Sequence, residues 1–219
     1  MRFGVISDVH ANAVALRAVL ADMPPVDGLL CAGDVVGYGP APGECADTLA
    51  DRDVVSVSGN HDRAVVTDTA FRFNDMARAG VEYAREQLTD GQLTWLADLP
   101  TERRACDGYV KLVHGHPDDP DHYTRTHEFS SNLLRGEAVL VMGHTHVQHH
   151  ETYDDGIVMN PGSVGQPRDS DPRAAYAVLD MDDGTVEERR VEYDIEAVQE
   201  QVAAAGLPER IGTRLEDGR

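Results

Sequence analysis

Five short stretches of the sequence carry side chains that typically bind metal ions, and each one follows an apolar run. In the central stretch, the run from Gly28 to Ala32 ends at Gly33, and Asp34 then places a carboxylate at the start of a loop. A carboxylate has two oxygens and can therefore serve two neighbouring cations. The other stretches are Asp8-Val9-His10, Gly59-Asn60-His61-Asp62, Val113-His114 and Gly143-His144-Thr145-His146. Together they predict a two-metal centre in which Asp34 is the shared ligand.

The spacing within these stretches suits convergence on a cation. Asp8 and His10 are separated by one residue, as are His144 and His146, so each pair leaves an extended segment on the same side. Asn60 offers a neutral carbonyl oxygen, which hard or borderline divalent cations accept. Any one of these stretches alone is more often an ordinary polar loop. Five of them at predicted strand ends favour a site, because open α/β sheets bind ligands beyond the carboxyl ends of their strands.

His61 is predicted to act differently from the ligands. An imidazole that neighbours a metal ligand such as Asn60, without binding the metal itself, can donate a proton or a hydrogen bond to a leaving oxygen. Asp62 is the candidate to orient the His61 ring. His61 is therefore the predicted catalytic residue.

Apolar runs that alternate with helical patterns predict the scaffold. Strands are expected at residues 3–7, 28–32, 54–58, 110–113, 139–142, 151–153, 157–159, 174–181 and 185–193. Helices are expected after Asn12 and within 44–50, 71–100 and 195–205. The first strands are continuously apolar, which indicates a sheet covered on both faces. One domain spanning residues 1–219 is expected, with 206–219 as a frayed or peripheral tail.

The excess of acidic over basic residues limits the kinds of molecule that the protein is expected to bind. Asp and Glu number 39 against 19 Lys and Arg, the net charge is -20, and Lys111 is the only lysine. A nucleic acid is therefore disfavoured as a tight partner, because such binding depends on basic side chains. The composition resembles that of extreme halophiles, since screening over roughly 3 Å at 1 M salt makes a large acidic excess tolerable.

The cysteine content and the length of the apolar runs bear on the cellular compartment. The three cysteines are too few and too far apart to predict a disulfide framework or a zinc site. No apolar run approaches the roughly 20 residues that a membrane span requires, so no membrane partner is expected. A cytoplasmic protein is expected, and its oligomeric state is left open.

The ordered set of ligand-bearing stretches resembles that of the calcineurin-like metallophosphoesterases, over residues 1 to 170. The segment 160–168, Asn-Pro-Gly-Ser-Val-Gly-Gln-Pro-Arg, is similar to one in the compact bacterial and archaeal phosphodiesterase branch. The resemblance implies an α/β fold, a four-layer α-β-β-α sandwich of two mixed sheets flanked by helices. By this resemblance the first metal is held by Asp8, His10, Asp34 and His146, and the second by Asp34, Asn60, His114 and His144.

The implied activity is hydrolysis of a phosphoester, and more specifically of a phosphodiester that is small or nucleotide-like. A hydroxide bridging two divalent ions attacks phosphorus, and His61 assists the leaving alkoxide. Manganese is the expected metal, while iron, zinc, nickel and cobalt also suit mixed oxygen and nitrogen ligands. A phosphomonoesterase or a protein phosphatase is the alternative within the family. A non-catalytic regulator that binds metal or nucleotide is the rival of another class.

One departure from related branches bears on the substrate. The protein-phosphatase branch and the allied dinucleoside tetraphosphatases carry an Arg shortly after the bridging Asp, where this chain has Val-Val-Gly-Tyr-Gly at 35–39. Arg168 is instead a candidate to contact the substrate phosphate, and Tyr38 to stack on a base or to wall the pocket. An ion pair or a loop-packing role explains each equally well. No role is assigned to the remaining histidines, His116, His122, His127, His149 and His150.

Overall fold

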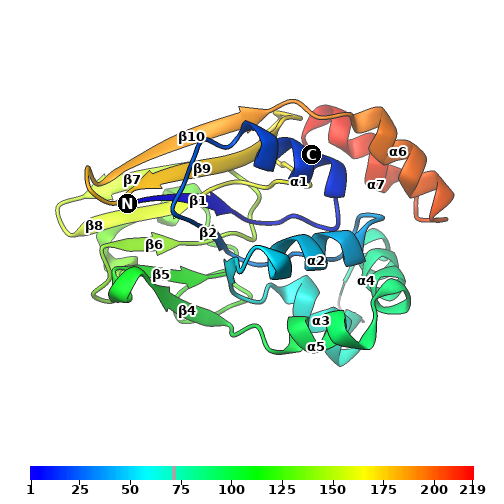
Figure 1. Ribbon diagram of the computed structural model, residues 1–219, viewed down its shortest axis with the longest axis horizontal. Helices are drawn as coiled ribbons and strands as arrows, with labels where there is room; N and C mark the ends of the chain where they lie inside the picture. The colour runs from blue at the N-terminus through cyan, green and yellow to red at the C-terminus, as the bar shows by residue number, and fades with distance from the viewer. Residues whose placement is uncertain (71–72) are drawn as a thin grey trace.

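The computed structural model describes residues 1–70 and 73–219, so Phe71, within the predicted helical stretch, lies outside the described residues. In the described part, two sheets of five strands each form the centre of the molecule (Figure 1). Sheet A has the order β10-β9-β1-β2-β3, with β1 (Arg2–Ile6), β2 (Gly28–Cys31), β3 (Val55–Ser56), β9 (Ala174–Asp180) and β10 (Thr185–Val191). Sheet B has the order β4-β5-β6-β8-β7, with β4 (Glu102–Ala105), β5 (Val110–Val113), β6 (Val139–Val141), β7 (His149–Tyr153) and β8 (Gly156–Asn160).

Both sheets are mixed. In sheet A, β1, β2 and β3 run parallel, while β9 is antiparallel to both β1 and β10. In sheet B, β5, β6 and β8 run parallel, and the edge strands β4 and β7 are antiparallel to their neighbours. Within each sheet the parallel strands therefore end at one edge, and Figure 1 shows β1 running from the N-terminus toward the end where the helices gather.

The helices are α1 (Ala13–Asp22), α2 (Pro42–Asp51), α3 (Asn60–Thr67), α4 (Asp75–Gln87), α5 (Asp90–Ala97), α6 (Ile195–Ala204) and α7 (Arg210–Thr213). As predicted, Asn12 caps α1 by accepting the Ala15 N–H at 3.0 Å, and Thr89 and Gln92 form a capping box at α5. The sequence did not predict α3, which begins at Asn60. Among the described residues, no helix has the length and apolar character needed to cross a bilayer.

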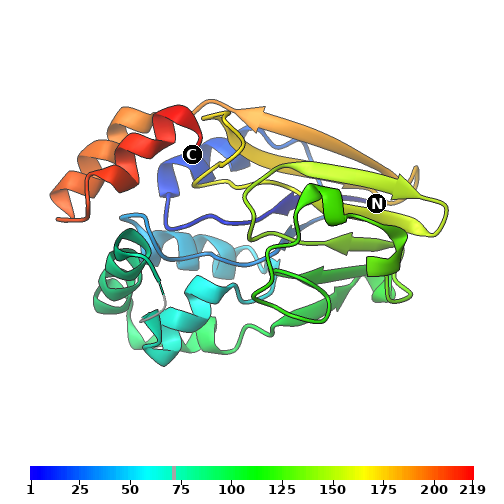
Figure 2. The ribbon, with the colours of Figure 1, turned by 180° about the vertical axis from the view of Figure 1, so that it is seen from behind.

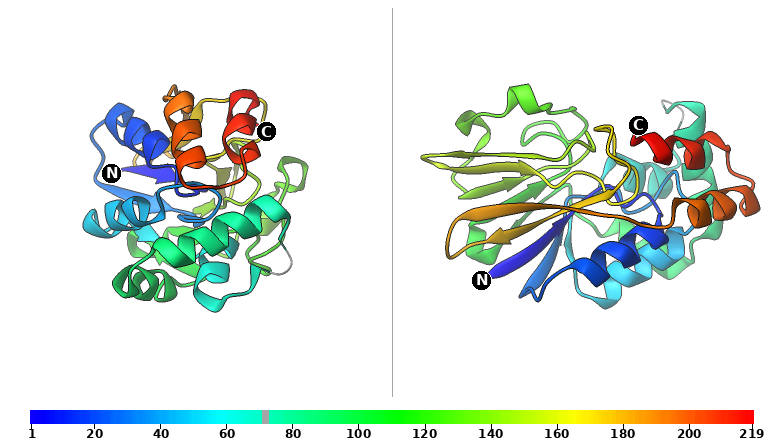
Figure 3. Two further views of the ribbon diagram at one scale, coloured as in Figure 1. Left: turned by 90° about the vertical axis from the view of Figure 1, so that its right-hand side faces the viewer. Right: turned by 90° about the horizontal axis from the view of Figure 1, so that it is seen from above.

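The first strands are continuously apolar because both faces of their sheet are covered by apolar clusters. Val5 of β1 belongs to the apolar cluster between the sheets, and its neighbour Ile6 to the cluster beneath α1 and α2. On the outer face of sheet B, Leu140 packs with Phe129 and Leu133 from the segment that contains the short 3-10 helices η3 (Thr126–Glu128) and η4 (Ser131–Leu133). This segment, green in Figure 2, lies on the side of the sheets opposite α1 (Figure 3, right). The predicted fold class, two mixed sheets packed together and flanked by helices, is confirmed.

The end of the chain, predicted as a frayed or peripheral tail, is helical rather than frayed. Residues 210–217 form α7 and the 3-10 helix η5 (Arg214–Asp217), and Leu207, Ile211 and Leu215 are buried. These side chains recur every fourth residue and so share one face, which packs against α6 and Tyr38. The charged residues between them conceal this apolar face in the sequence.

Candidate metal centre

The ligand-bearing stretches meet where the carboxyl ends of β1, β2, β3, β5 and β6 converge. Within sheet A, the Asp8 N–H donates to Gly33 O at 2.9 Å. Between the sheets, the His144 N–H donates to Asp8 Oδ2 at 3.0 Å, so the loops after β6 and β1 are joined directly. The structure thus brings together all the predicted ligands, buried except for half-buried Asn60: Asp8, His10, Asp34, Asn60, His114, His144 and His146.

Asp8, His10 and His146 form one group of ligand atoms. Asp8 Oδ1 lies 3.2 Å from His146 Nε2, and the Nε2 atoms of His10 and His146 are 3.1 Å apart. One ligand atom from each residue lies within 4.8 Å of the others. A carboxylate oxygen and two imidazole nitrogens at this spacing could hold a divalent transition-metal ion.

Asp34, His114 and His144 form a second group, with Asn60 beside it. His114 Nε2 lies 3.2 Å from Asp34 Oδ2 and 3.1 Å from His144 Nδ1. Asn60 Oδ1 is 3.2 Å from the same nitrogen. Asp34 Oδ2 is also 3.7 Å from His10 Nε2 in the first group. A single carboxylate oxygen therefore lies between the two groups.

Backbone carbonyls fix the orientation of the four imidazoles in these groups. The outward ring nitrogen of each lies near a carbonyl oxygen: Val36 O for His10 (3.3 Å), Ala32 O for His114 (2.7 Å), Asp121 O for His144 (3.2 Å) and Gln166 O for His146 (2.6 Å). Because a carbonyl can only accept, the outward nitrogen carries the proton. In the neutral ring, the inward nitrogen then presents a lone pair, as it does in metal-binding histidines.

The inward nitrogens of His10 and His146 have no hydrogen bond to make with each other. Burial lowers the pKa of both rings well below the usual value, so both are neutral. Two lone pairs therefore face each other across 3.1 Å, which is unfavourable unless a cation lies against them. The donor set of this group fits a metal ion.

Asp34 and His114 stabilise each other's charged forms. Burial disfavours both charges, but the facing imidazoles of His114 and His61 outweigh it and hold the pKa of Asp34 well below its usual value. Burial alone would lower the pKa of His114, but the effect of the nearby Asp34 carboxylate is larger and raises that pKa to about 9. A metal at His114 Nε2 displaces this proton, because a ligating imidazole is deprotonated there.

The loops that hold the ligands adopt strained conformations. Five ligands have φ between 48° and 68°: Asp8, His10, Asp34, His144 and His146. A left-handed conformation costs a residue with a side chain on the order of 1–3 kcal/mol, and such strain clusters at functional sites. Gly59 is required by close approach, since a Cβ there would lie 1.9 Å from Asp34 Oδ1.

The segment from Asn160 to Arg168 holds two ligand loops in place. Ser163 Oγ donates to Asp8 O at 2.7 Å, and Asn160 Nδ2 donates to Gly143 O at 2.7 Å. The first bond supports the loop after β1 and the second supports the loop after β6. The structure therefore supplies a physical role for the segment that carried part of the sequence resemblance.

His61 lies beside both groups but is held differently from the other buried imidazoles. Its ring centroid is 4.8 Å from that of His10 and 4.6 Å from that of Phe73. Its Nδ1 is buried and finds no hydrogen-bond partner among the described residues. Burial lowers its pKa to about 4, so the ring is neutral. His61 thus lacks the carbonyl contact that orients the other four rings.

Asp62 does not orient His61, and that prediction is wrong. Asp62 Oδ2 accepts the Gly59 N–H at 2.9 Å, and Oδ1 accepts the Val36 N–H at 3.0 Å. A carboxylate in the third position of a helix reaches back to the N–H before the helix more readily than to an adjacent side chain. The His61 N–H donates to Asp34 Oδ1 at 2.8 Å, so the start of α3 also stabilises that carboxylate.

The two predicted substrate contacts, Arg168 and Tyr38, lie next to each other. The guanidinium carbon of Arg168 is 5.8 Å from the centre of the Tyr38 ring, and its Nη2 donates to Gln166 Oε1 at 2.7 Å. Tyr38 is only 5% exposed and packs against His10 and His61 with centroids 4.9 and 4.7 Å apart. Because Tyr38 is buried, its face is not open for stacking on a base.

Tyr123 is a candidate site residue that the sequence did not reveal. It is 46% exposed and stacks on His144, with centroids 3.8 Å apart and planes inclined by 26°. Two residues earlier, Asp121 accepts from His144 through its carbonyl and pairs with Arg63 through its side chain. The loop from 116 to 127 is thus fastened over the second group. A lone tyrosine in a polar loop carries too weak a signal to reveal this.

Two cavities flank Tyr123, which lines both of them. The first, about 450 Å³, is lined by Asn60, Arg63, Ala64, Thr69, Phe73, Asp121, Tyr123 and His144. The second, about 420 Å³, is lined by Tyr123, Arg125, Thr126, His127, Thr145, Val147 and Arg168. Residues of the second ligand group and its loop therefore open onto two separate spaces.

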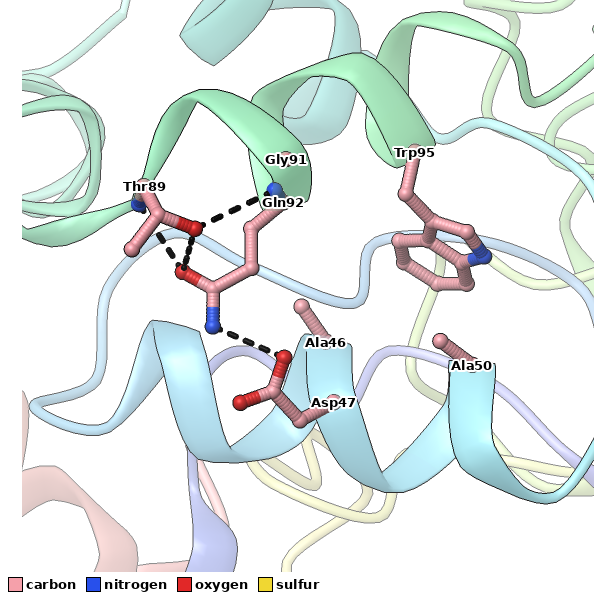
Figure 4. Close-up of a pocket in the computed structure, with 7 residues that line it drawn as sticks. All are labelled: Ala46, Asp47, Ala50, Thr89, Gly91, Gln92 and Trp95. Atoms are coloured by element: carbon pink, nitrogen blue, oxygen red, sulfur yellow. Dashed lines mark hydrogen bonds between the residues drawn. The ribbon is translucent and has the colours of Figure 1, made fainter.

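A further cavity, of about 210 Å³, lies between α2 and α5 (Figure 4). Several of its polar groups bond to one another: Gln92 Nε2 donates to Asp47 Oδ1 at 2.8 Å, and Thr89 Oγ1 accepts the backbone N–H of Gln92 at 3.3 Å. No histidine or cysteine lines it. This cavity has none of the chemistry of the metal centre.

Comparisons with known proteins agree with the geometry. A model of the calcineurin-like phosphoesterase superfamily domain matches residues 1–184. An uncharacterised protein of Methanocaldococcus jannaschii is 33% identical, over 98% of this chain and 97% of its own length. The crystal structure of a metallophosphoesterase from Sphaerobacter thermophilus superposes with a TM-score of 0.87 at 38% identity, over 100% of this chain and 99% of that one. The phosphodiesterase YfcE of Escherichia coli is 28% identical over 83% of this chain and 89% of its own length. The chain belongs to the calcineurin-like phosphoesterase superfamily.

Proposed function

We propose that this metallophosphoesterase is a phosphodiesterase that uses two divalent metal ions. The observation that carries the proposal is the pairing of inward imidazole nitrogens, which occurs twice, at His10 with His146 and at His114 with His144. Asp34 Oδ2 lies between the two pairs. Two pairs of inward imidazole nitrogens and a carboxylate between them are the donor set of a dinuclear centre.

The residues divide between the two ions as the family resemblance implies. One ion would be held by Asp8, His10, Asp34 and His146, and the other by Asp34, Asn60, His114 and His144. When bound, the ions neutralise phosphate oxygens and lower the pKa of a water so that it serves as the nucleophile at neutral pH. Manganese suits these mixed ligands, with iron, zinc, nickel or cobalt as alternatives.

His61 acts on the leaving oxygen. Its ring is neutral and borders His10 and Asp34, within 4.8 Å of the ligand atoms of both. As the oxygen of water bonds to phosphorus, the P–O bond to the leaving alcohol breaks. The neutral His61 ring assists by donating an N–H hydrogen bond to the leaving oxygen, which takes its proton from water. The proposed roles of Arg168 and Tyr38 are to attract the phosphate by charge and to hold the His10 and His61 rings in place.

The two cavities beside Tyr123 support a diester as substrate. A phosphodiester carries an organic group on each side of phosphorus, and the spaces of about 450 and 420 Å³ offer room for one group each. A monoester fills only one. The name of the relative YfcE, a phosphodiesterase at 28% identity, points in the same direction.

We also propose that the protein works in a cytoplasm of high salt concentration, because its net charge is -20 and it has a single lysine. Self-repulsion of that size weakens a compact fold at low ionic strength and is screened at high ionic strength. Unfolding midpoints should therefore rise with KCl concentration. Equal stability in dilute buffer and in molar KCl would contradict this part of the proposal.

The test of function uses the wild-type protein with Mn²⁺ in molar KCl. We expect two metal ions per chain and hydrolysis of bis(p-nitrophenyl) phosphate with a higher kcat/KM than that of p-nitrophenyl phosphate. A higher kcat/KM for the monoester or for a phosphopeptide would replace the diesterase by a monoesterase or protein phosphatase. A protein that is loaded with metal but inert toward every ester would indicate a regulator.

A further inference from the structure

The cavity that contains Arg168 is basic, although the chain is strongly acidic. Arg125, His127 and Arg168 line it together with one tyrosine, two threonines and a valine, and no carboxylate is among the lining residues. The chain has about two acidic residues for each basic one, 39 against 19. A cavity whose charged lining is entirely basic is therefore a local reversal of the protein's charge.

The two arginines of this cavity differ from most other arginines in their partners. Arg63, Arg104 and Arg190 each lie against a carboxylate. Within residues 1–70 and 73–219, neither Arg125 nor Arg168 has such an ion pair. Arg168 donates instead to Gln166 Oε1 and to the Tyr38 hydroxyl, and its Nε is buried with no acceptor among the described residues. Two guanidinium groups without a carboxylate partner among the described residues leave positive charge at this cavity, and that charge suits an anion.

The position of His61 distinguishes the two cavities. Phe73 lines the first cavity, and its ring centroid is 4.6 Å from that of His61. Since His61 is proposed to donate a hydrogen bond to the leaving oxygen, the leaving group occupies the Phe73 side. The group that stays attached to phosphorus then occupies the Arg125 and Arg168 side.

We propose, on the basis of the function above, that the basic cavity binds a second phosphate group carried by the retained arm of the diester. The substrate class is then a phosphodiester with a further phosphate on the arm that remains with the product, such as a phosphorylated dinucleotide. Arginine suits this role because its planar fork of donors binds phosphate oxygens in pairs.

The test compares two chromogenic esters that share one leaving group. Thymidine 5′-(p-nitrophenyl phosphate) is assayed with and without a 3′-phosphate, so that only the remote anion differs. We expect kcat/KM to be at least about tenfold higher with the 3′-phosphate, as one charge-assisted contact provides. Arg125→Gln should remove most of this preference, so that the ratio of kcat/KM between the two esters falls toward one.

Arg103→Gln is the matched control, because Arg103 lies on β4, is exposed and does not line the cavity. It should leave both esters unchanged. Equal kcat/KM for the two esters in the wild type, or an equal loss on both in Arg125→Gln, would overturn the inference and leave the diesterase function standing.

Binding supplies a readout that does not need turnover. Titration calorimetry on metal-free protein should show thymidine 3′,5′-bisphosphate binding more tightly than thymidine 5′-monophosphate, and Arg125→Gln should abolish the difference. If neither ester is hydrolysed by the metal-loaded protein, the proposed function fails, and this calorimetric difference still decides whether the second phosphate is bound. Equal affinities in the wild type would reject the phosphate site.

Discussion

The ten histidines of the chain divide into two regions with contrasting surroundings. Five lie in the buried centre where the strands end: His10, His61, His114, His144 and His146. Five are exposed or half-buried in the loop from 116 to 127 and on β7: His116, His122, His127, His149 and His150. Three of this second set lie beside a carboxylate, at Glu128, Glu151 and Glu188.

The two regions show that surroundings, rather than residue type, separate a candidate ligand from a surface histidine. At the surface, a carboxylate partner in water contributes little, and the ring is free to face solvent. At four of the five central histidines, an outward nitrogen bonded to a carbonyl leaves the inward nitrogen facing the ligand groups and shielded from water. Only the second arrangement prepares an imidazole for a metal.

Removal of the shared carboxylate should have the largest effect. Asp34→Asn keeps the size of the side chain but removes the charge that lies between the two ligand groups. We expect kcat/KM for an aryl phosphodiester to fall about a thousandfold, the upper range for loss of one preorganised electrostatic contact. Metal content, measured by inductively coupled plasma mass spectrometry, should fall with it. A variant that keeps both ions would show that Asp34 is not the shared ligand.

Among the described residues, His61 is the buried histidine without a carbonyl partner, and His61→Gln tests its role. We expect the variant to retain its metal and to lose about a hundredfold in kcat for an alkyl ester, in the range for a perturbed hydrogen bond to a developing negative charge. The loss should be smaller for a p-nitrophenyl ester, because p-nitrophenolate delocalises the charge of its leaving oxygen.

The matched variant is His114→Gln, which removes an imidazole that does face the ligand groups. It should lose metal as well as activity. If His61→Gln instead loses metal to the same degree, His61 is a ligand, and the carbonyl contact does not distinguish the two kinds of buried ring.

A smaller effect is expected from Asn160→Ala, which removes a support rather than a ligand. Its side chain donates to Gly143 O and to Thr145 Oγ1, on the loop that carries His144 and His146. We expect metal affinity to fall by about 10- to 100-fold, as for other groups that orient ligands. The Gly162 N–H, which donates to Asn160 Oδ1 at 2.9 Å, would lose its acceptor, so the free energy of unfolding should also fall by about 1–3 kcal/mol, measured by denaturant titration. Unchanged metal affinity would show that the loop holds its shape without this bond.

The sequence predicted the fold class and the residues that come together because both depend on local patterns. Apolar runs ending in a polar side chain predict a strand and the position just beyond it. Parallel strands then bring these positions to one edge without any further information. This is why Asp8 and Asp34, which follow neighbouring strands of sheet A, could be grouped from the sequence. His114 follows a strand of sheet B, and its place beside them was implied by the family resemblance.

What the sequence did not predict depends on contacts between distant segments. Asp62 bonds to Gly59 and Val36 rather than to His61, and this choice depends on how α3 begins beside the loop after Asp34. Tyr123 reaches His144 only because Asp121 fastens its loop to that ring. Such contacts leave no periodic pattern, so they appear only in the structure.

The smallest effect is expected from His150→Gln on the surface side of the comparison. His150 Nδ1 lies 2.7 Å from Glu188 Oε1, on the edge of β7 and away from the ligand groups. A half-exposed pair of this kind contributes little, so the free energy of unfolding should change by less than about 0.5 kcal/mol. Metal content and kcat/KM should both equal those of the wild type. Loss of metal from this variant would contradict the division between the two regions, because His150 has neither the burial nor the carbonyl contact that characterises the candidate ligands.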